Sequence, residues 1–234
     1  MFANNEIGTI QPIKEISKIA KDSEIIFHTD CVQAVGNVKI DVNEFGIDLL
    51  SMSAHKFYGP KGVGALYVRN GIEFTRIQDG GHQEKNKRAG TENVAGIVGL
   101  GKAIEIADNN LENYNSKLLK LRNYFIREIT SKYDNVKING DLKQRLPGNI
   151  NISFPGIDAE ELLLKLDNQG ICASAGSACS SGSTQPSHVL TAIGVRDELA
   201  KGAVRFTFGD FNTKEDVDYL VDVLKQIKEE KKWD

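Results

Sequence analysis

Apolar runs of strand length alternate with helical segments along this chain, and that alternation predicts an α/β fold. In residues 1–110, the strand candidates 25–28 and 48–52 are joined by a segment long enough to lead back over the sheet, as in a right-handed βαβ unit. Residues 111–234 hold shorter strands mixed with helices. We therefore predict part of a large, mainly parallel-sheet domain over 1–110, followed by a smaller α+β domain over 111–234.

The first half of the chain opens with a predicted helix. Pro12 suits the first turn of a helix, and Ile13, Ile16 and Ile19 follow at helical spacing. The segments expected next are a buried strand at 25–28, a short strand or loop at 38–42, a buried strand at 47–52, a returning strand at 63–68, and a helix over 92–132 that is interrupted near 108–110.

The second half predicts three strands and three helices. Its strand candidates are rich in apolar and β-branched residues, and its last helix begins at Thr213 with acidic residues close behind. The predicted strands are 136–139, 149–154 and 204–208, and the predicted helices are 159–168, 187–193 and 213–228.

Composition excludes several classes of protein. The 234 residues include 29 Lys+Arg and 32 Asp+Glu, a net charge of −3, so there is no basic surface for nucleic acid or a membrane. No apolar run reaches the roughly 20 residues of a membrane span, and residues 1–6 lack the features of a secretory signal. The cysteines number only three, an odd count that argues against a disulfide framework. They form no Cys-X-X-Cys pair, which argues against a structural zinc site. We expect a cytoplasmic protein with no resident metal.

Lys56 lies at the tip of the predicted hairpin, directly after Ser53 and His55, and the chain breaks at Gly59 and Pro60. A lysine held in a pocket at such a tip can lose its charge by desolvation and act as a nucleophile. The alternative is that Lys56 is one of 29 basic residues on a solvated surface.

Three other polar residues stand where chemistry is plausible. Asp30 ends an apolar strand, where a carboxylate either caps the following turn or binds a ligand. Asn5 is either a turn residue or a ligand-binding amide. Arg205 is flanked by Val204 and Phe206, and it either reaches outward from a strand or binds a carboxylate through two hydrogen bonds.

Two cysteines allow different interpretations. Cys179 lies among Ser, Ala and Gly, with no large apolar neighbour to bury it against, so we expect an exposed thiol on a loop rather than a small buried hydrophobe. Cys172 follows Gly170 and Ile171 in a strand-like context and is expected to be structural.

These stretches together resemble the NifS/IscS-type cysteine desulfurases of the class-V aminotransferase family, which depend on pyridoxal phosphate. The resemblance extends through essentially the whole chain, in the family's order and spacing. It rests on residues 3–8, on 27–33, on 53–62, on 88–91, on 176–179 with 186–190, and on 204–209.

The resemblance implies a fold type I enzyme with a function for each candidate residue. Lys56 would bind the cofactor covalently, and Cys179 would be the catalytic thiol. The other implied contacts are Ser53 and His55 to the cofactor phosphate, Asp30 to the pyridinium nitrogen, Gln33 to the phenolic oxygen, Thr91 to the phosphate of the partner subunit, Asn5 to the ring and the substrate carboxylate, and Arg205 to the substrate carboxylate.

The implied reaction converts L-cysteine to L-alanine and leaves a persulfide for an iron–sulfur scaffold or another sulfur acceptor, in a homodimer. A transient contact of Cys179 with an iron–sulfur cluster is also implied. The alternatives are a selenocysteine lyase or an aminotransferase on the same fold, or an inactive remnant that acts as a binding subunit.

The sequence departs from the family pattern in two places. His82 stands where a third glycine is usual. The N-terminal third of the family, with a glycine-threonine phosphate cup and a histidine that stacks on the ring, has no counterpart here. We therefore expect weak or absent cofactor binding and no turnover from this chain alone, with both restored when the missing segment is supplied as a separate chain.

Overall fold

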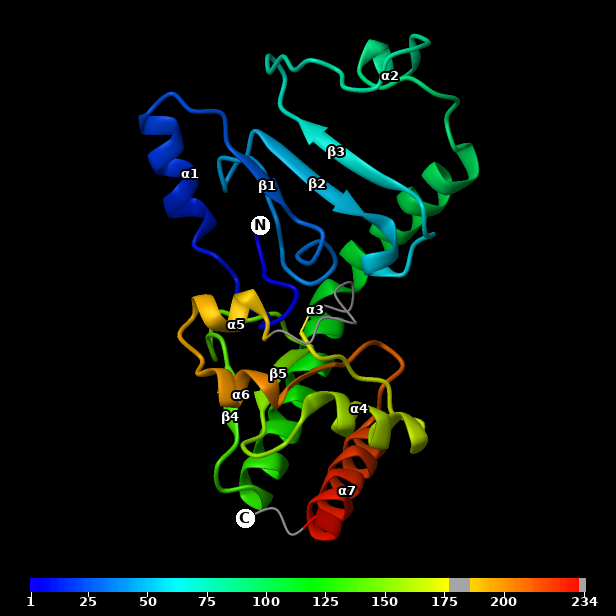
Figure 1. Ribbon diagram of the computed structural model, residues 1–234. Helices are drawn as coiled ribbons and strands as arrows, with labels where there is room; N and C mark the ends of the chain where they lie inside the picture. Colours follow the sequence, from blue (N-terminus) through cyan, green and yellow to red (C-terminus); the bar gives the residue numbers. More distant parts are fainter. Residues whose placement is uncertain (177–185, 232–234) are drawn as a thin grey trace. The chain divides into compact units, whose positions relative to one another are not determined.

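The computed structural model describes residues 1–176 and 186–231, and these fall into two compact units (Figure 1). The first unit comprises Met1–Phe2 and Gln11–Leu111, and the second comprises Ala3–Ile10 and Glu112–Asp234. The predicted first domain, 1–110, includes residues 3–10. In the structure this short segment groups with the second unit.

The first unit is built on a three-stranded sheet of mixed direction (Figure 1). Its strands are β1 (His28–Asp30), β2 (Leu49–Ser53) and β3 (Gly64–Val68). The first two are parallel, with Asp30 opposite Ser51, and β3 returns antiparallel to β2. The predicted hairpin is confirmed, and the carboxyl ends of β1 and β2 lie at the same sheet edge.

The helices of the first unit follow the prediction less closely. Helix α1 (Ile13–Asp22) begins directly after Pro12, as expected. Helix α3 (Val94–Lys132) continues for 39 residues, so the predicted interruption near 108–110 is wrong. A four-residue helix, α2 (Gln83–Asn86), lies between β3 and α3.

The strand predicted at residues 25–28 is misplaced. Ile25 and Ile26 precede β1 and are 62% and 54% exposed. The strand itself begins at His28, and Thr29 is its buried residue. The segment predicted as a short strand or loop at 38–42 contains no strand.

The second unit has a three-stranded antiparallel sheet in the order β4-β5-β6. The predicted strands and helices are present, with ends that differ by at most three residues, and one short helix, α6, was not predicted. The elements are β4 (Lys137–Asn139), β5 (Asn149–Ser153), α4 (Ala159–Asn168), α5 (His188–Ala192), α6 (Asp197–Lys201), β6 (Ala203–Thr207) and α7 (Lys214–Lys231).

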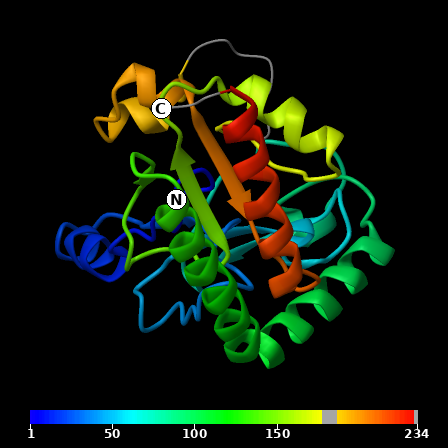
Figure 2. The ribbon, with the colours of Figure 1, turned by 90° about the horizontal axis from the view of Figure 1, so that it is seen from below.

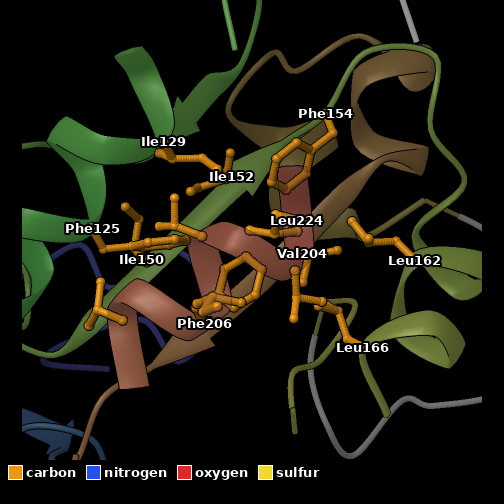
Figure 3. Close-up of a cluster of buried hydrophobic side chains, with 14 of the residues drawn as sticks. Phe125, Ile129, Ile150, Ile152, Phe154, Leu162, Leu166, Val204, Phe206 and Leu224 are labelled. Atoms are coloured by element: carbon orange, nitrogen blue, oxygen red, sulfur yellow. The ribbon is translucent and has the colours of Figure 1, made fainter. Parts of the chain in front are cut away.

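Every residue of the central strand β5 is buried, and this strand forms the middle of the second unit's core (Figure 3). The Phe125 ring lies edge-on to Phe206, with centroids 5.2 Å apart, and Leu224 of α7 is completely buried. Figure 2 shows α7 running beside β6. The core fixes β6, the strand that carries Arg205, between β5 and the C-terminal helix.

Within the described part of the chain, no helix is long and apolar enough to cross a membrane. The same residues contain no group of three or more His, Cys, Asp or Glu side chains placed to hold a metal ion.

Candidate active site

Lys56 lies in a single turn of 3₁₀ helix, η1 (Ala54–Phe57), that follows β2 directly. Ala54 and Phe57 are buried at its two ends, whereas His55 and Lys56 are exposed. The turn ends at Tyr58, whose backbone is left-handed with φ of 65°. The buried residues anchor the turn, and the side chains that carry chemistry face away from the core.

Two glycines allow the chain to close this turn. A Cβ at Gly59 would lie 2.9 Å from the Ala54 carbonyl oxygen, and a Cβ at Gly64 would lie 2.5 Å from the Met52 carbonyl oxygen. Both distances are shorter than real Cβ contacts. Glycine at these positions therefore lets the backbone of the hairpin approach the lysine turn.

Ser53 and His55 form a pair beside the lysine. The Ser53 Oγ lies 2.9 Å from His55 Nδ1. Lys56 makes no ion pair or side-chain hydrogen bond with any residue in the described ranges, and it is exposed. The pocket expected to desolvate Lys56 is therefore not supplied by the described residues of one chain.

Asp30 ends β1 at the same sheet edge. Its Oδ1 accepts a 2.8 Å hydrogen bond from the Val32 backbone N–H, so the turn-capping interpretation is confirmed for this oxygen. Its Oδ2 receives no hydrogen bond from residues in the described ranges. The half-buried carboxylate can cap its turn through Oδ1 and still accept a hydrogen bond from a ligand at Oδ2.

The segment after Asp30 packs against the lysine turn. Gly36 has φ of +79°, and a Cβ there would lie 2.8 Å from Phe57 Cβ. Cys31 donates its backbone N–H to the Ser51 carbonyl at 2.9 Å and is completely buried, which raises the pKa of its thiol to about 12. Gln33, which lies between Cys31 and Gly36 in the sequence, is half-buried.

Thr91 is not brought into hydrogen-bond contact with the other candidates in the first unit. It is exposed and lies just before α3. His82, the predicted departure from a glycine, has φ of −96°, a conformation that any residue adopts. Its Nδ1 lies 3.1 Å from Asn86 Oδ1.

The second unit brings Asn5 and Arg205 together. Asn4, not Asn5, makes the turn, because its Oδ1 accepts the backbone N–H groups of Glu6 and Ile7 at 2.9 and 3.0 Å. The Asn5 carbonyl accepts a 2.8 Å hydrogen bond from Arg205 Nη1. The half-buried Arg205 side chain is therefore directed toward the Asn5 backbone, and the Asn5 side chain is not needed for the turn.

Arg205 is also joined to the segment that leads to Cys179. Its backbone N–H donates to the Ser174 carbonyl at 2.7 Å, and the Ser174 N–H donates to the Arg205 carbonyl at 3.2 Å. Cys179 itself lies outside the described residues. Cys172 is exposed and lies outside every strand of the described residues, so the predicted strand context is wrong.

Sequence reasoning missed Glu6. This residue is only 3% exposed, and its Oε2 accepts a 2.5 Å hydrogen bond from Ser187 Oγ. No local pattern signals this burial, because charged side chains are mostly exposed and Ser187 lies far along the chain.

The donor set of the first unit fits a phosphorylated pyridine that carries an aldehyde. Ser53 and His55 offer a hydroxyl and an imidazole to a phosphate, and Asp30 offers a carboxylate oxygen to a protonated ring nitrogen. Lys56 supplies the primary amine for a covalent bond to the aldehyde.

Comparison with known proteins points in the same direction. Residues 1–220 match the family described as aminotransferase class-V. The chain is 58% identical over 229 residues to the cysteine desulfurase IscS of Dictyoglomus turgidum, and the alignment covers 98% of this chain and 58% of that protein. It is 55% identical over 227 residues to the IscS of Methanosarcina thermophila, with 97% and 56% covered.

Solved structures show the same likeness. A NifS-like protein from Rickettsia africae superposes with a TM-score of 0.90 at 36% identity, over 97% of this chain and 60% of that one. SspA in complex with cysteine superposes with a TM-score of 0.72 at 35% identity, over 91% and 58%. The chain thus spans a little under 60% of the length of the curated relatives described here.

Proposed function

Because the chain belongs to the class-V aminotransferase family, we propose that it acts as a cysteine desulfurase that depends on pyridoxal phosphate. The observation that carries the proposal is the arrangement in the first unit. There the Ser53–His55 pair adjoins Lys56, and Asp30 ends the neighbouring parallel strand. The 58% identity to a desulfurase supports the specific activity.

The cofactor would be held by residues at the sheet edge. Lys56 would bind it covalently, Ser53 and His55 would donate to its phosphate, and Asp30 would accept from its ring nitrogen, with Gln33 at its phenolic oxygen. Pyridoxal phosphate, when bound, supplies an electron-withdrawing ring that stabilises negative charge on the substrate α-carbon.

The other candidate residues would bind the substrate and transfer its sulfur. Arg205 would bind the carboxylate of L-cysteine, with Asn5 beside it. The Lys56 amine, once released from the cofactor, would take the α-proton as a general base. The Cys179 thiolate would attack the substrate sulfur, forming a sulfur–sulfur bond. The carbon–sulfur bond breaks with its electron pair left on carbon, which takes up a proton, and the products are L-alanine and a persulfide.

The proposed partners follow from this product. A persulfide needs a protein thiol or an iron–sulfur scaffold to receive its sulfur. We also propose a homodimer in the cytoplasm, in which Thr91 reaches the cofactor phosphate of the partner subunit. An analytical ultracentrifugation dilution series tests the dimer, and a fully active monomer would refute it.

The visible absorption spectrum of the purified protein, before and after addition of L-cysteine, tests the function. We expect at most a weak band and no L-alanine from the chain alone. When the N-terminal third of the family is supplied as a separate chain, we expect a band from the bound cofactor that changes when cysteine is added, and L-alanine in the solution. A Cys179→Ala variant should keep the band and lose alanine production. An aminotransferase has no need of Cys179, so unchanged turnover in this variant would contradict the proposal.

A further inference from the structure

Two arginines are buried in the second unit without an acidic partner. Arg122 lies in α3 and is 6% exposed, and Arg145 lies between β4 and β5 and is 4% exposed. Neither side chain forms an ion pair with an acidic residue in the ranges 1–176 and 186–231. Arginine is rarely buried unless its charge is paired, because taking a charge out of water is costly. This unit therefore buries two positive charges that none of those residues balances.

The guanidinium group of Arg145 has one nitrogen without an acceptor. Its Nε donates to the Asp141 carbonyl at 2.7 Å, and its Nη2 donates to the Asn139 carbonyl. Its Nη1 is buried and has no hydrogen-bond partner among the described residues. Buried N–H groups are nearly always paired, since an unmade hydrogen bond in the interior is costly. The backbone thus holds one edge of the guanidinium, and Nη1 still requires an acceptor.

The acceptors that contact Arg122 are all neutral. Its Nη1 donates to the Leu146 carbonyl at 3.1 Å, and its Nε and Nη2 share the Asn123 Oδ1 at 3.4 and 3.2 Å. Burial, and after it the charge of Arg122, lower the pKa of Arg145 to about 10. Both groups are therefore charged at neutral pH and lie close enough to repel each other.

Asp141 does not neutralise this pair, although its charge acts on Arg145. Its Oδ1 accepts the backbone N–H groups of Lys143 and Gln144, each at 2.6 Å. The side chain is exposed, and these two hydrogen bonds lower the pKa of its carboxyl. The Asp141 carboxylate therefore stabilises its own turn in solvent and makes no contact with either guanidinium.

Gly140 keeps the region beside the Arg145 guanidinium free of a side chain. Its φ is +82°, and a Cβ there would lie 2.8 Å from Thr9 Oγ1 and 3.0 Å from Arg145 Nη2. The Thr9 Oγ1 accepts from the Asp141 backbone N–H at 3.1 Å, and it donates to none of the described residues. A hydroxyl hydrogen is thus available close to the guanidinium.

We propose that Arg145 and Arg122 form a binding site for a small inorganic anion, with chloride as the ligand. The anion would accept from Arg145 Nη1, and its charge would balance the two guanidinium groups. A buried water would satisfy Nη1 but would leave both charges unbalanced. Because both side chains are less than a tenth exposed, a monatomic ion fits them better than an organic acid, which needs an open pocket.

The bound anion would stabilise the second unit where its N-terminal segment joins the loop between β4 and β5. Thr9 and Arg145 pair through an isolated backbone bridge, and the Leu146 backbone N–H donates to the Gly8 carbonyl at 2.9 Å. A ligand that binds only the folded state shifts the folding equilibrium toward that state. The site is independent of the proposed catalytic residues.

Urea denaturation followed by circular dichroism tests the site, with chloride replaced by gluconate at constant ionic strength. We expect the folded-to-unfolded equilibrium constant to rise roughly tenfold between about 5 and 200 mM chloride. In Arg145→Gln and Arg122→Gln this rise should fall below about twofold. Arg127→Gln is the matched control, because Arg127 lies in the same helix as Arg122 with a side chain that is 70% exposed, and it should keep the full rise.

Diffraction from crystals of the unaltered protein grown in bromide gives a second test that needs no variant to fold. We expect an anomalous peak within hydrogen-bond reach of Arg145 Nη1. A water there without anomalous signal, or bromide found only elsewhere on the protein, overturns the inference. Chloride dependence that is absent from the unaltered protein, or unchanged in both glutamine variants, overturns it as well.

Discussion

The Ser53 Oγ lies 2.9 Å from Nδ1 of His55, immediately before Lys56. Ser53 has extended backbone at the end of β2, and His55 is already in the 3₁₀ turn, so the change of backbone conformation between them brings the two side chains together. A hydroxyl and an imidazole this close can both form hydrogen bonds with one phosphate group. Lys56 follows His55 directly in the same turn.

Lys56→Ala should abolish covalent attachment of the cofactor and lower the rate of sulfur release by about 10²–10⁴-fold, the range of a lost general base. Borohydride reduction followed by peptide mass mapping checks the attachment. Lys61→Ala, an exposed lysine five residues on, is the control and should leave a pyridoxyl group on Lys56. A pyridoxyl group found on Lys61 in the unaltered protein would contradict the assignment.

Gly36→Ala should disturb the lysine turn because its new Cβ would lie 2.8 Å from Phe57 Cβ, in addition to the strain of φ at +79°. Gly71→Ala is matched in strain, with φ of +91°, but its Cβ would meet nothing within 4 Å. We expect Gly71→Ala to lower the free energy of unfolding by about 1–2 kcal/mol, and Gly36→Ala to lower it further.

Urea denaturation and the yield of borohydride-trapped cofactor measure these two effects. Only Gly36→Ala should reduce the yield, since Phe57 is the buried anchor of the turn that carries Lys56. Equal stability and equal yield in the two variants would show that Gly36 does not support the turn.

Cys31 should resist alkylation in the folded protein, whereas exposed Cys172 should react readily. Burial raises the pKa of the Cys31 thiol from 9.0 to about 12, so little reactive thiolate forms. Peptide mapping after treatment with iodoacetamide compares the two sites, and both should react once the chain is unfolded. Rapid labelling of Cys31 in the native protein would refute the burial argument.

The same pKa shift predicts how stability changes at high pH. The folded state holds the Cys31 proton more tightly than the unfolded chain does. The contribution of Cys31 to the free energy of unfolding is therefore complete below pH 9.0 and declines as the pH rises toward about 12. Replacing Cys31 with Ala should therefore make the free energy of unfolding fall less steeply above pH 9.0. Identical pH profiles for the variant and the unaltered protein would contradict the shift.

Leu224→Ala should destabilise the second unit by about 2–5 kcal/mol, because the side chain is completely buried in the core and its loss leaves a cavity. Leu164→Ala is the matched control on another helix. Leu164 is 67% exposed, so its replacement should change stability by no more than about 0.5 kcal/mol. Guanidinium denaturation measures both, and equal losses would show that the core is misassigned.

Elements with strong local signals were predictable from the sequence. Helix α4 begins after Asp158, whose side chain accepts the backbone N–H groups of Glu160 and Glu161, and its predicted range matches the structure. Local patterns also gave the β2–β3 hairpin, because the glycines at its tip are required by close backbone approach.

Features that depend on tertiary context were not predictable. Asn109 and Asn110 suggested a helix end, but each costs less than about 1 kcal/mol in a helix interior and α3 continues through them. Ile25 and Ile26 have the composition of a buried strand and are exposed. The hydrogen bond between Glu6 and Ser187 joins residues 181 positions apart, which no local pattern reveals.

The candidate site was predictable mainly through its motifs. Apolar runs and turn residues indicated that Asp30 and Lys56 stand at strand ends, and the parallel pairing of β1 and β2 brings those ends to one edge. The sequence left open whether Lys56 lies in a pocket or on a solvated surface, because local sequence does not show which other residues cover a side chain. In the structure Lys56 is exposed.

The most direct test of the account is the mass of the Cys179 peptide after the chain has reacted with L-cysteine in the presence of the family's N-terminal third as a separate chain, with alanine measured in the same sample. The account predicts one added sulfur atom on Cys179 in amounts that match the first turnover of alanine, and no added sulfur on Cys172. Alanine formed without sulfur on Cys179, or sulfur carried by Cys172 instead, would contradict it.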